Sequence, residues 1–133
     1  MTNLAEELWL HLRTHLEEFA KKVTMADSSL IYNIGKTTNK AFLLRGYLSL
    51  MKRSDGNEVA ITVDVQTDDD LLSVVSDVCT DDGVIIAVGP SVSIPSSGNQ
   101  INIKAALDEW LDEFGRFLQE SEPTVVTSVS ELL

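Results

Sequence analysis

Apolar residues along this chain repeat with two different periods, and the change of period separates expected helices from expected strands. Near the N-terminus they recur every three or four residues, which predicts an amphipathic helix over about residues 4–23. Residues 103–120 have the same spacing and predict a second helix, whose other face is strongly acidic. The apolar positions of this second helix are Ile103, Leu107, Trp110, Leu111, Phe114, Phe117 and Leu118.

Between the two helices, apolar residues alternate with polar ones, which is typical of strands with one wet face. A polar run at residues 36–40 predicts a turn, and Asp55-Gly56 is the signal of a tight hairpin. The alternation predicts three strands, at Leu30–Ile34, Phe42–Met51 and Val59–Gln66.

The stretch Leu71–Thr80 has two interpretations. Its apolar residues have helical spacing, and Thr67 with Asp70 is a suitable cap for a helix start. Against this, the segment is rich in valine, a β-branched residue, and Asp81-Asp82-Gly83 serves equally well as a hairpin turn. We predict a short helix, with a strand as the alternative.

The last third of the chain is expected to complete the sheet and then form the second helix. Val84–Val88 is apolar on both alternating faces, which predicts a central, covered strand. Ser91–Ile94 alternates as a short continuation or partner of that strand. Asn102 is the expected cap of the last helix, and Pro123 lies just beyond its expected end. Residues 123–133 are therefore predicted to be a loose tail, with docking of Val125, Val126 and Val129 as the alternative.

The predicted order is helix, three strands, short helix, one or two strands, long helix. This order is typical of an α+β fold in which an antiparallel sheet is covered on one face by helices. The chain has 133 residues, of which 44% are hydrophobic, enough for a packed core. Because no linker or internal repeat divides it, residues 1–122 are predicted to form a single domain.

The charge of the chain is strongly negative and unevenly spread. With 21 acidic and 10 basic residues the formal net charge is −11, which argues against nucleic-acid binding, because phosphate backbones are bound mainly by Lys and Arg. Five basic residues and no acid lie between Lys36 and Arg53, whereas nine acids and no base lie between Asp55 and Asp82. If the two stretches lie on separate surfaces, the domain has a dipole, whereas if they pair as neighbouring strands, their charges partly cancel. A basic partner suits this composition.

The composition also bears on where the protein works. A single cysteine, Cys79, rules out an internal disulfide and agrees with a reducing compartment. Glu6 and Glu7 lie where a signal peptide needs basic residues. No apolar run approaches the roughly 20 residues of a membrane helix. We expect a cytoplasmic protein that does not contact membranes.

Three candidate motifs are better explained as structure. Gly35-Lys36-Thr37 resembles the end of a phosphate-binding loop, but Leu30 stands where another glycine is required, and a strand follows instead of a helix. His11 and His15 share one helix face without a third metal ligand, which favours a solvated surface pair. Cys79 lacks a nearby base and lies on the apolar face of the proposed short helix, so we expect a buried structural thiol.

Acidic clusters do not indicate catalysis or metal binding either. Their spacing is not that of a calcium loop, and helix caps and turns account for them. Among 21 acids, nothing singles out a carboxylate pair for acid–base chemistry. We therefore predict no catalytic, cofactor or metal site, and no enzyme activity. The cluster consists of Asp68, Asp69, Asp70, Asp81 and Asp82.

The order, size and acidity of these elements resemble the type III secretion chaperone fold. The resemblance covers residues 4–23, the three strands, the short helix at 71–80, the strand at 84–88 and the last helix. It implies a small acidic homodimer that holds an extended segment of another protein on exposed sheet and helix surfaces. It carries over no functional residue, because no signature motif is involved.

Three hypotheses of function follow. The first is a non-enzymatic, chaperone-like, homodimeric domain that binds a segment of a partner protein in apolar grooves with acidic rims. The second is an acidic inhibitor of the immunity or antitoxin type, which uses the carboxylates at 64–82 or 108–113 to block a basic protein. The third is a small-ligand-binding α+β domain, which requires an enclosed pocket lined by polar groups.

Overall fold

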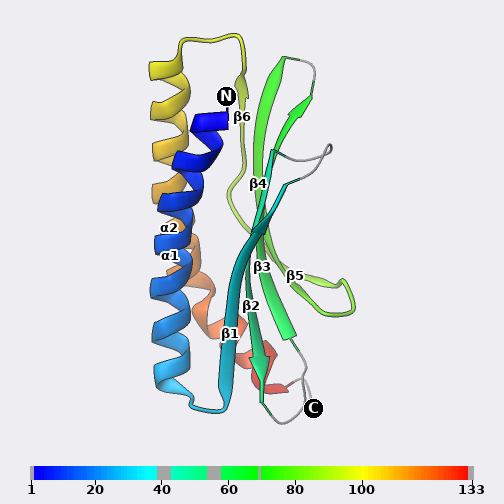
Figure 1. The fold of residues 1–133 in the computed structure, drawn as a ribbon. Coiled ribbons are helices and arrows are strands. Elements are labelled where there is room, and N and C mark those ends of the chain that lie inside the picture. Colours follow the sequence, from blue (N-terminus) through cyan, green and yellow to red (C-terminus); the bar gives the residue numbers. More distant parts are fainter. Residues whose placement is uncertain (1, 39–42, 54–57, 69, 132–133) are drawn as a thin grey trace.

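The computed structural model describes residues 2–38, 43–53, 58–68 and 70–131 (Figure 1). The predicted Asp55-Gly56 hairpin turn lies outside these ranges, although the strands on either side of it pair antiparallel. The helices and strands are α1 (Thr2–Ala26), β1 (Leu30–Thr37), β2 (Leu44–Lys52), β3 (Glu58–Asp68), β4 (Leu71–Thr80), β5 (Ile85–Val88), β6 (Val92–Pro95) and α2 (Gln100–Glu131).

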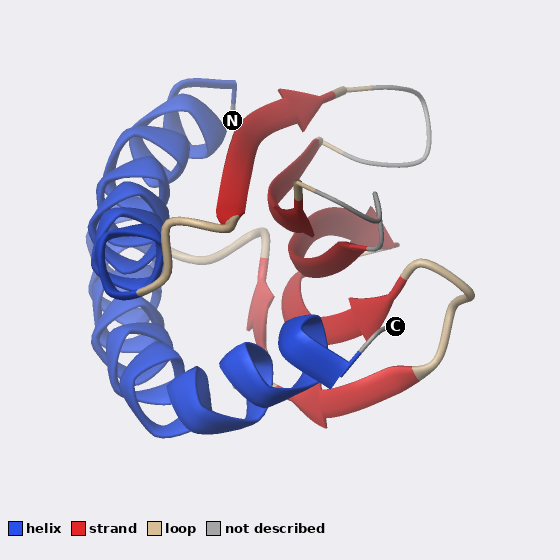
Figure 2. Cartoon of the chain, turned by 90° about the horizontal axis from the view of Figure 1, so that it is seen from below, coloured by secondary structure: helices blue, strands red, loops and turns tan. Residues whose placement is uncertain are grey.

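The fold has two layers, a layer of helices and an antiparallel sheet. Strands lie in the order β1-β2-β3-β4-β5, and β6 pairs with the first half of β4 while β5 pairs with its second half. Both helices lie on one face of the sheet, and no described helix covers the other (Figures 1 and 2). The predicted α+β class, with an antiparallel sheet covered on one face, is confirmed.

The core lies between the two layers and follows the alternation seen in the sequence. Every second side chain of the central strands points at the helices and is buried, because successive residues of a strand face opposite sides of the sheet. From the other side, α1 contributes residues spaced by three or four, such as Leu12, Leu16 and Phe19. The buried strand residues are Leu44, Leu48, Leu50, Val59, Ile61, Val63, Val65, Leu72, Val74 and Val78.

Gly46 lets α1 approach β2 closely. A Cβ atom at this position would lie 2.8 Å from Trp9 Cζ3 and 3.0 Å from Leu12 Cδ2, and both of these side chains are buried. At Gly35, by contrast, an added Cβ would meet the hydroxyl end of the half-buried Tyr47 on the uncovered face. A Cβ at Gly46 would therefore meet core atoms of Trp9 and Leu12 that have no space to move into.

Gly46→Ala is therefore expected to lower the free energy of unfolding by about 1–3 kcal/mol through overpacking. Gly35→Ala is the matched control, and we expect a smaller loss because Tyr47 can swing toward solvent. Urea denaturation of both variants measures the difference. Equal losses at the two positions would show that the helix–sheet contact at Gly46 is not tight.

The predicted short helix at Leu71–Thr80 is wrong, and the alternative strand is found. The segment is β4, which pairs with β3 over ten residue pairs from Val59↔Thr80 to Asp68↔Leu71. Its buried residues alternate with period two, as expected of a strand with one face on the core. Valine-rich composition and long-range pairing thus outweigh local helical spacing.

Val84–Val88 was predicted to be a central, covered strand, and this prediction is also wrong. The strand there, β5, lies at the edge of the sheet and has only β4 as a described neighbour. A register shift between Val78 and Cys79 accompanies the pairing. At this edge, the apolar side chains of Ile85 and Val88 are exposed to solvent.

The predicted loose tail at 123–133 is wrong as far as the structure describes it. Helix α2 begins at Gln100, with the side chain of Asn99 rather than Asn102 as its cap, and continues through Pro123 to Glu131. Val125 and Val129 are fully buried, so the docking alternative holds for these residues. Proline cannot donate to the preceding turn, which favours a bend, and the last turns of α2 cross the end of the sheet (Figure 2).

Candidate functional site

The candidate site is the face of the sheet that the helices leave uncovered. It is built from the strand residues that alternate with the core residues. The strand register places them in three rows, which are Thr37, Arg45, Asp64 and Val75; Gly35, Tyr47, Thr62, Asp77 and Val88; and Asn33, Ser49, Ala60, Cys79 and Ile85.

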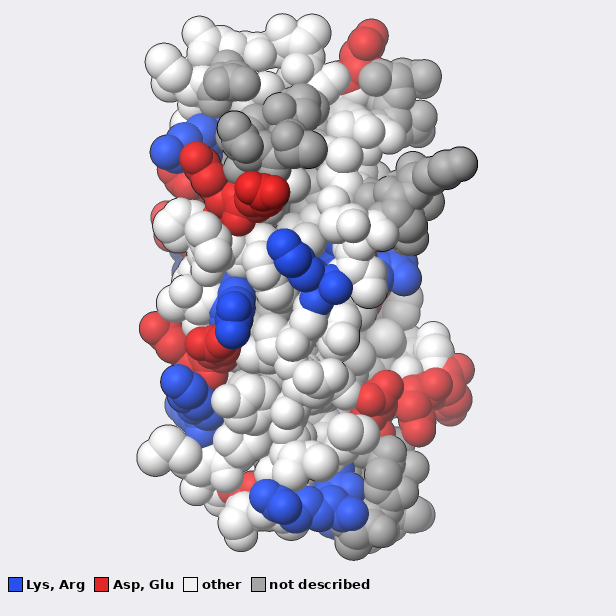
Figure 3. Space-filling view, viewed as in Figure 1, with Lys and Arg blue, Asp and Glu red and all other residues white. Residues whose placement is uncertain are grey.

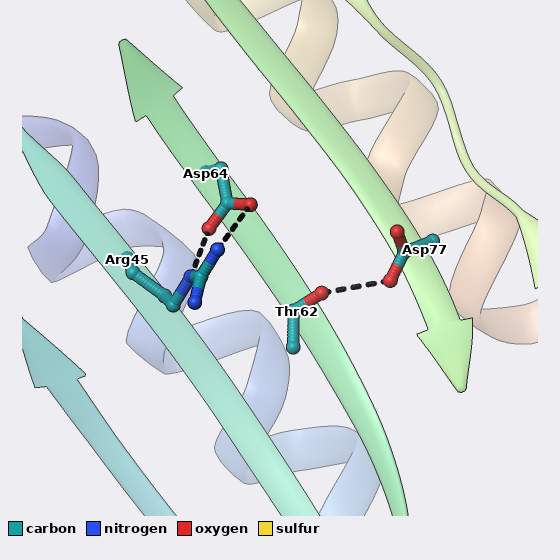
Figure 4. A network of polar contacts seen from close by, with 4 residues as sticks. All are labelled: Arg45, Thr62, Asp64 and Asp77. Atoms are coloured by element: carbon teal, nitrogen blue, oxygen red, sulfur yellow. Dashed lines mark hydrogen bonds and ion pairs between the residues drawn. The ribbon is translucent and has the colours of Figure 1, made fainter. Parts of the chain in front are cut away.

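The centre of this face is polar, and its charged groups bind one another. Arg45 Nε donates to Asp64 Oδ1 at 2.6 Å and Nη2 to Oδ2 at 3.1 Å, a bidentate pair across β2 and β3 (Figure 4). The hydrogen bond that Arg45 donates to Asp64 is the main reason that the pKa of Arg45 is raised. Thr62 Oγ1 donates to Asp77 Oδ1 at 2.8 Å. The basic and acidic stretches of the sequence therefore partly cancel here.

The β4–β5 side of the face is apolar and exposed. We define the β4–β5 patch as Val75, Val84, Ile85 and Val88, with 43%, 55%, 55% and 78% of their surface exposed. On the uncovered face, Ile85 lies opposite Cys79 and Val88 lies opposite Asp77. Single exposed aliphatic residues are ordinary on protein surfaces, but a group of them on β5 and the segments beside it is a feature of binding surfaces.

The end of β5 is held firmly by the rest of the fold. The carbonyl oxygen of Pro90 accepts hydrogen bonds from Trp110 Nε1 and from Ser76 Oγ, each at 2.9 Å. The Gly89 amide donates to the Ser76 carbonyl at 3.0 Å, and a Cβ at Gly89 would meet Ser76 Oγ and Phe117. Because α2 and β4 both hydrogen-bond to residues 89–90, the end of β5 is fixed in position.

Acidic side chains lie at both ends of β5. Asp81 and Asp82 are exposed in the β4–β5 turn, where Figure 3 shows acidic groups gathered on the projecting hairpin. Beyond the other end of β5, Glu109 and Glu113 of α2 line a cavity of about 180 Å³ together with Ser91, Val92, Ala106 and Trp110. Lys and Arg side chains instead gather over β1 and β2 (Figure 3). The patch is thus apolar with acidic ends.

Cys79 belongs to this face and not to the core, so the prediction of a buried structural thiol is wrong in its location. The residue is half-buried on β4, beside the β4–β5 patch. Partial burial raises the pKa of its thiol, and the carboxylates of Asp77 and Glu58 raise it further. The thiol is therefore protonated at neutral pH and weakly nucleophilic.

We expect iodoacetamide to alkylate Cys79 more slowly in the folded protein than in the urea-unfolded chain at the same pH. The rate should rise only as the pH passes the ordinary pKa of a thiol, because a raised pKa leaves less thiolate at any lower pH. Asp77→Asn keeps an acceptor for Thr62 but removes a charge, so it should accelerate the reaction partway, since burial is the larger cause. Mass spectrometry gives the rates; an unchanged rate in the Asn variant would contradict the role of Asp77.

The histidines lie on the other side of the molecule, next to the groove between α1 and α2. His11 is exposed, whereas His15 is half-buried, with its Cε1 3.2 Å from where a Cβ at Gly115 would lie. The predicted solvated pair therefore describes His11 but not His15. The groove has a volume of about 380 Å³ and is open to solvent, and its charged lining includes an ion pair between Lys22 Nζ and Glu122 Oε1 at 3.0 Å.

The other sequence motifs fall into structural positions. Gly35-Lys36-Thr37 forms the end of β1, so the strand is longer than predicted and the turn expected at 36–40 does not begin at Lys36; residues 39 and 40 lie outside the described residues. Asp81 and Asp82 lie in a hairpin turn, as the strand alternative required, whereas Asp69 lies outside the described residues. Within the described ranges, no group of three His, Cys, Asp or Glu residues is placed to hold a metal ion. No described helix is both long and apolar enough to cross a membrane.

Sequence reasoning missed the β4–β5 patch because it took an apolar run for a buried one. The sequence did contain a usable signal. Asp81-Asp82-Gly83 and Gly89-Pro90 enclose a short segment, and short strands are common at the edges of sheets. In comparisons with known proteins, no protein family, curated protein or solved structure significantly matches the chain.

Proposed function

We propose that this protein is a non-enzymatic, chaperone-like binding domain that holds a segment of a partner protein against the β4–β5 patch. The observation that carries the proposal is the patch itself, four exposed aliphatic side chains of which Ile85 and Val88 lie on the edge strand β5, Val84 directly precedes it and Val75 lies on β4. Exposed apolar clusters of this kind mark sites of protein association.

The proposal includes a homodimer in a reducing, cytoplasmic compartment. The dimer rests on the resemblance to secretion chaperones, which implied an interface on the short helix at Leu71–Thr80 or on the strands next to it. Because that segment is the strand β4, the resemblance is weaker than the sequence implied and leaves only neighbouring strands for the interface. The compartment follows from the single cysteine. Light scattering coupled to size-exclusion chromatography tests the dimer, which should have twice the 14.6 kDa mass of the chain.

The binding role is tested by affinity capture from a native lysate with two matched double variants. Val75→Ser with Val88→Ser makes the patch polar, whereas Leu10→Ser with Met25→Ser changes comparably exposed residues of α1. We expect the wild type and the α1 variant to recover the same stoichiometric partner and the patch variant to lose it. Recovery of no stoichiometric partner by the wild type, or equal loss in both variants, contradicts the proposal.

A second candidate, an acidic inhibitor of a basic protein, is favoured by one observation. Asp108, Glu109, Asp112 and Glu113 are all exposed on α2, and no Lys or Arg lies among them in the sequence. In that case replacing these four residues by their amides should abolish capture of a basic partner, whereas the Val75→Ser, Val88→Ser variant should retain it. The first candidate therefore predicts that the patch variant loses the partner and the four-amide variant retains it, whereas the second candidate predicts the reverse.

A further inference from the structure

The outer side of β5 offers backbone groups for pairing with another strand. In an antiparallel pair, successive residues direct their N–H and C=O groups alternately toward and away from the neighbouring strand. Among the described elements β5 pairs only with β4, so about half of its backbone groups point away from the sheet. An exposed edge of this kind is a template for an added strand.

Charge and proline, two of the devices that normally prevent such pairing, are missing from this edge, whereas two others are present: β5 has only four residues, and a register shift interrupts its pairing with β4. Residues 84–88 contain no charged residue and no proline, the two residue types most often used to blunt an edge. The opposite edge, β1, differs in this respect, because it carries the exposed polar residues Asn33 and Lys36. Of the two edges, β5 is thus the one open to an apolar strand.

The side chains around the edge define what such a strand must carry. Ile85 and Val88 are exposed on the uncovered face, and Ile86 and Ala87 pack partly against the core. A strand beside β5 would therefore favour apolar side chains at the positions next to Ile85 and Val88, which lie three residues apart because the pairing with β4 is irregular. A segment rich in β-branched residues such as Val and Thr meets this requirement.

The charges at the two ends of β5 define the flanks of the strand. Asp81 and Asp82 precede β5, Asp77 lies opposite Val88, and Glu109 and Glu113 line the cavity that begins at Ser91. Asp77 is partly balanced by Arg45, whereas the sequence has no Lys or Arg between Arg53 and Lys104, the stretch that contains Asp81 and Asp82. Basic residues at the ends of an incoming segment would be attracted, whereas a second copy of this chain, with net charge −11, would be repelled.

We propose that the partner segment binds as an extended strand added to β5, with apolar residues next to Ile85 and Val88 and Lys or Arg at its ends. This inference rests on the proposed function and specifies the partner that the β4–β5 patch selects. Backbone hydrogen bonds supply the pairing, Ile85 and Val88 supply apolar contact, and the acids at both ends select for basic flanks.

The test uses the purified full chain and a fluorescent peptide of alternating Val and Thr with a pair of Lys at each end. Two control peptides replace the Lys pairs by Glu, or carry N-methyl groups at alternate residues that remove the donors facing β5. We expect the Lys peptide to bind at least about 10-fold more tightly than the Glu peptide at low salt, with a difference that narrows at high salt. The N-methylated peptide should not bind.

Variants locate the binding site on the protein. Ile85→Lys should abolish binding of the Lys peptide, and Asp81→Asn with Asp82→Asn should weaken it several-fold, whereas Tyr32→Lys, an exposed position on the opposite edge, should not change it. Hydrogen exchange should slow in residues 84–88 when the peptide is bound. Circular dichroism and thermal unfolding confirm that each variant is folded.

Several outcomes overturn the inference and leave the proposed function standing. These are equal binding of the Lys and Glu peptides, binding of the N-methylated peptide, protection of β1 instead of β5, or self-association that Ile85→Lys abolishes in the absence of peptide. The last outcome would assign the edge to a second copy. Failure of the proposed function is a separate result: the wild type captures no stoichiometric partner, or capture does not depend on Val75 and Val88.

Discussion

Phe114→Ala is expected to lower the free energy of unfolding by about 3–5 kcal/mol. The Phe114 side chain is fully buried at the centre of the helix–sheet interface. Its ring stacks on Trp110 with 5.0 Å between the centroids and contacts Phe117 at 6.2 Å. Removing the ring leaves a cavity that neighbouring elements on both sides keep open, so little relaxation offsets the lost contacts. For a domain whose stability is about 5–15 kcal/mol, this is a large fraction.

Phe114→Leu is the control for this prediction. Because leucine retains most of the apolar volume, this variant should lower the free energy of unfolding by less than about 1.5 kcal/mol. Urea denaturation followed by tryptophan fluorescence reports both variants, since Trp110 lies against the altered ring. A loss below about 1 kcal/mol for the alanine variant would show that α2 does not pack here as tightly as its burial implies.

The double variant Val125→Ala, Val129→Ala is expected to lower the free energy of unfolding by about 3–5 kcal/mol. Both side chains are fully buried, and each substitution removes two methyl-sized groups at about 0.8 kcal/mol per group plus a cavity cost. The effect arises because the part of α2 after Pro123 covers one end of the sheet. A loose tail, the prediction from sequence, would leave the stability unchanged.

Thr124→Ala with Thr127→Ala is the matched control, since both threonines are exposed in the same turns of the helix. Alanine has the higher helix propensity, so this variant should be as stable as the wild type or slightly more stable. Thermal and urea denaturation of the two double variants give the comparison. Equal behaviour of the two variants would mean that the last turns of α2 do not contribute to the core.

Much of the fold was predictable because long amphipathic patterns carry redundant information. In α1 and in the first three turns of α2, many residues agree on one buried face, so one ambiguous position does not change the prediction. In β3, Val59, Ile61, Val63 and Val65 alternate strictly with polar residues, and all four are buried. The errors fall where a short apolar segment is compatible with more than one environment.

The candidate site was harder to predict than the fold, because it consists of what the fold leaves uncovered. Val75, Ile85 and Val88 look like core residues in sequence, and only the strand order exposes them. Arg45 and Asp64 are 19 residues apart, and their pairing depends on the register of β2 against β3. Such features follow from long-range contacts that no local pattern encodes.

The sequence by itself determined the two helices, the alternating strands, the α+β class and the strongly negative charge, since each follows from local periodicity or composition. Only the tertiary structure decided that Leu71–Thr80 is a strand, that α2 continues beyond Pro123, and that the apolar run at 84–88 lies at an edge. The physical reason is that an apolar segment of four or five residues gains about the same from burial in a helix, a central strand or an interface. Its neighbours in space decide which of these it meets.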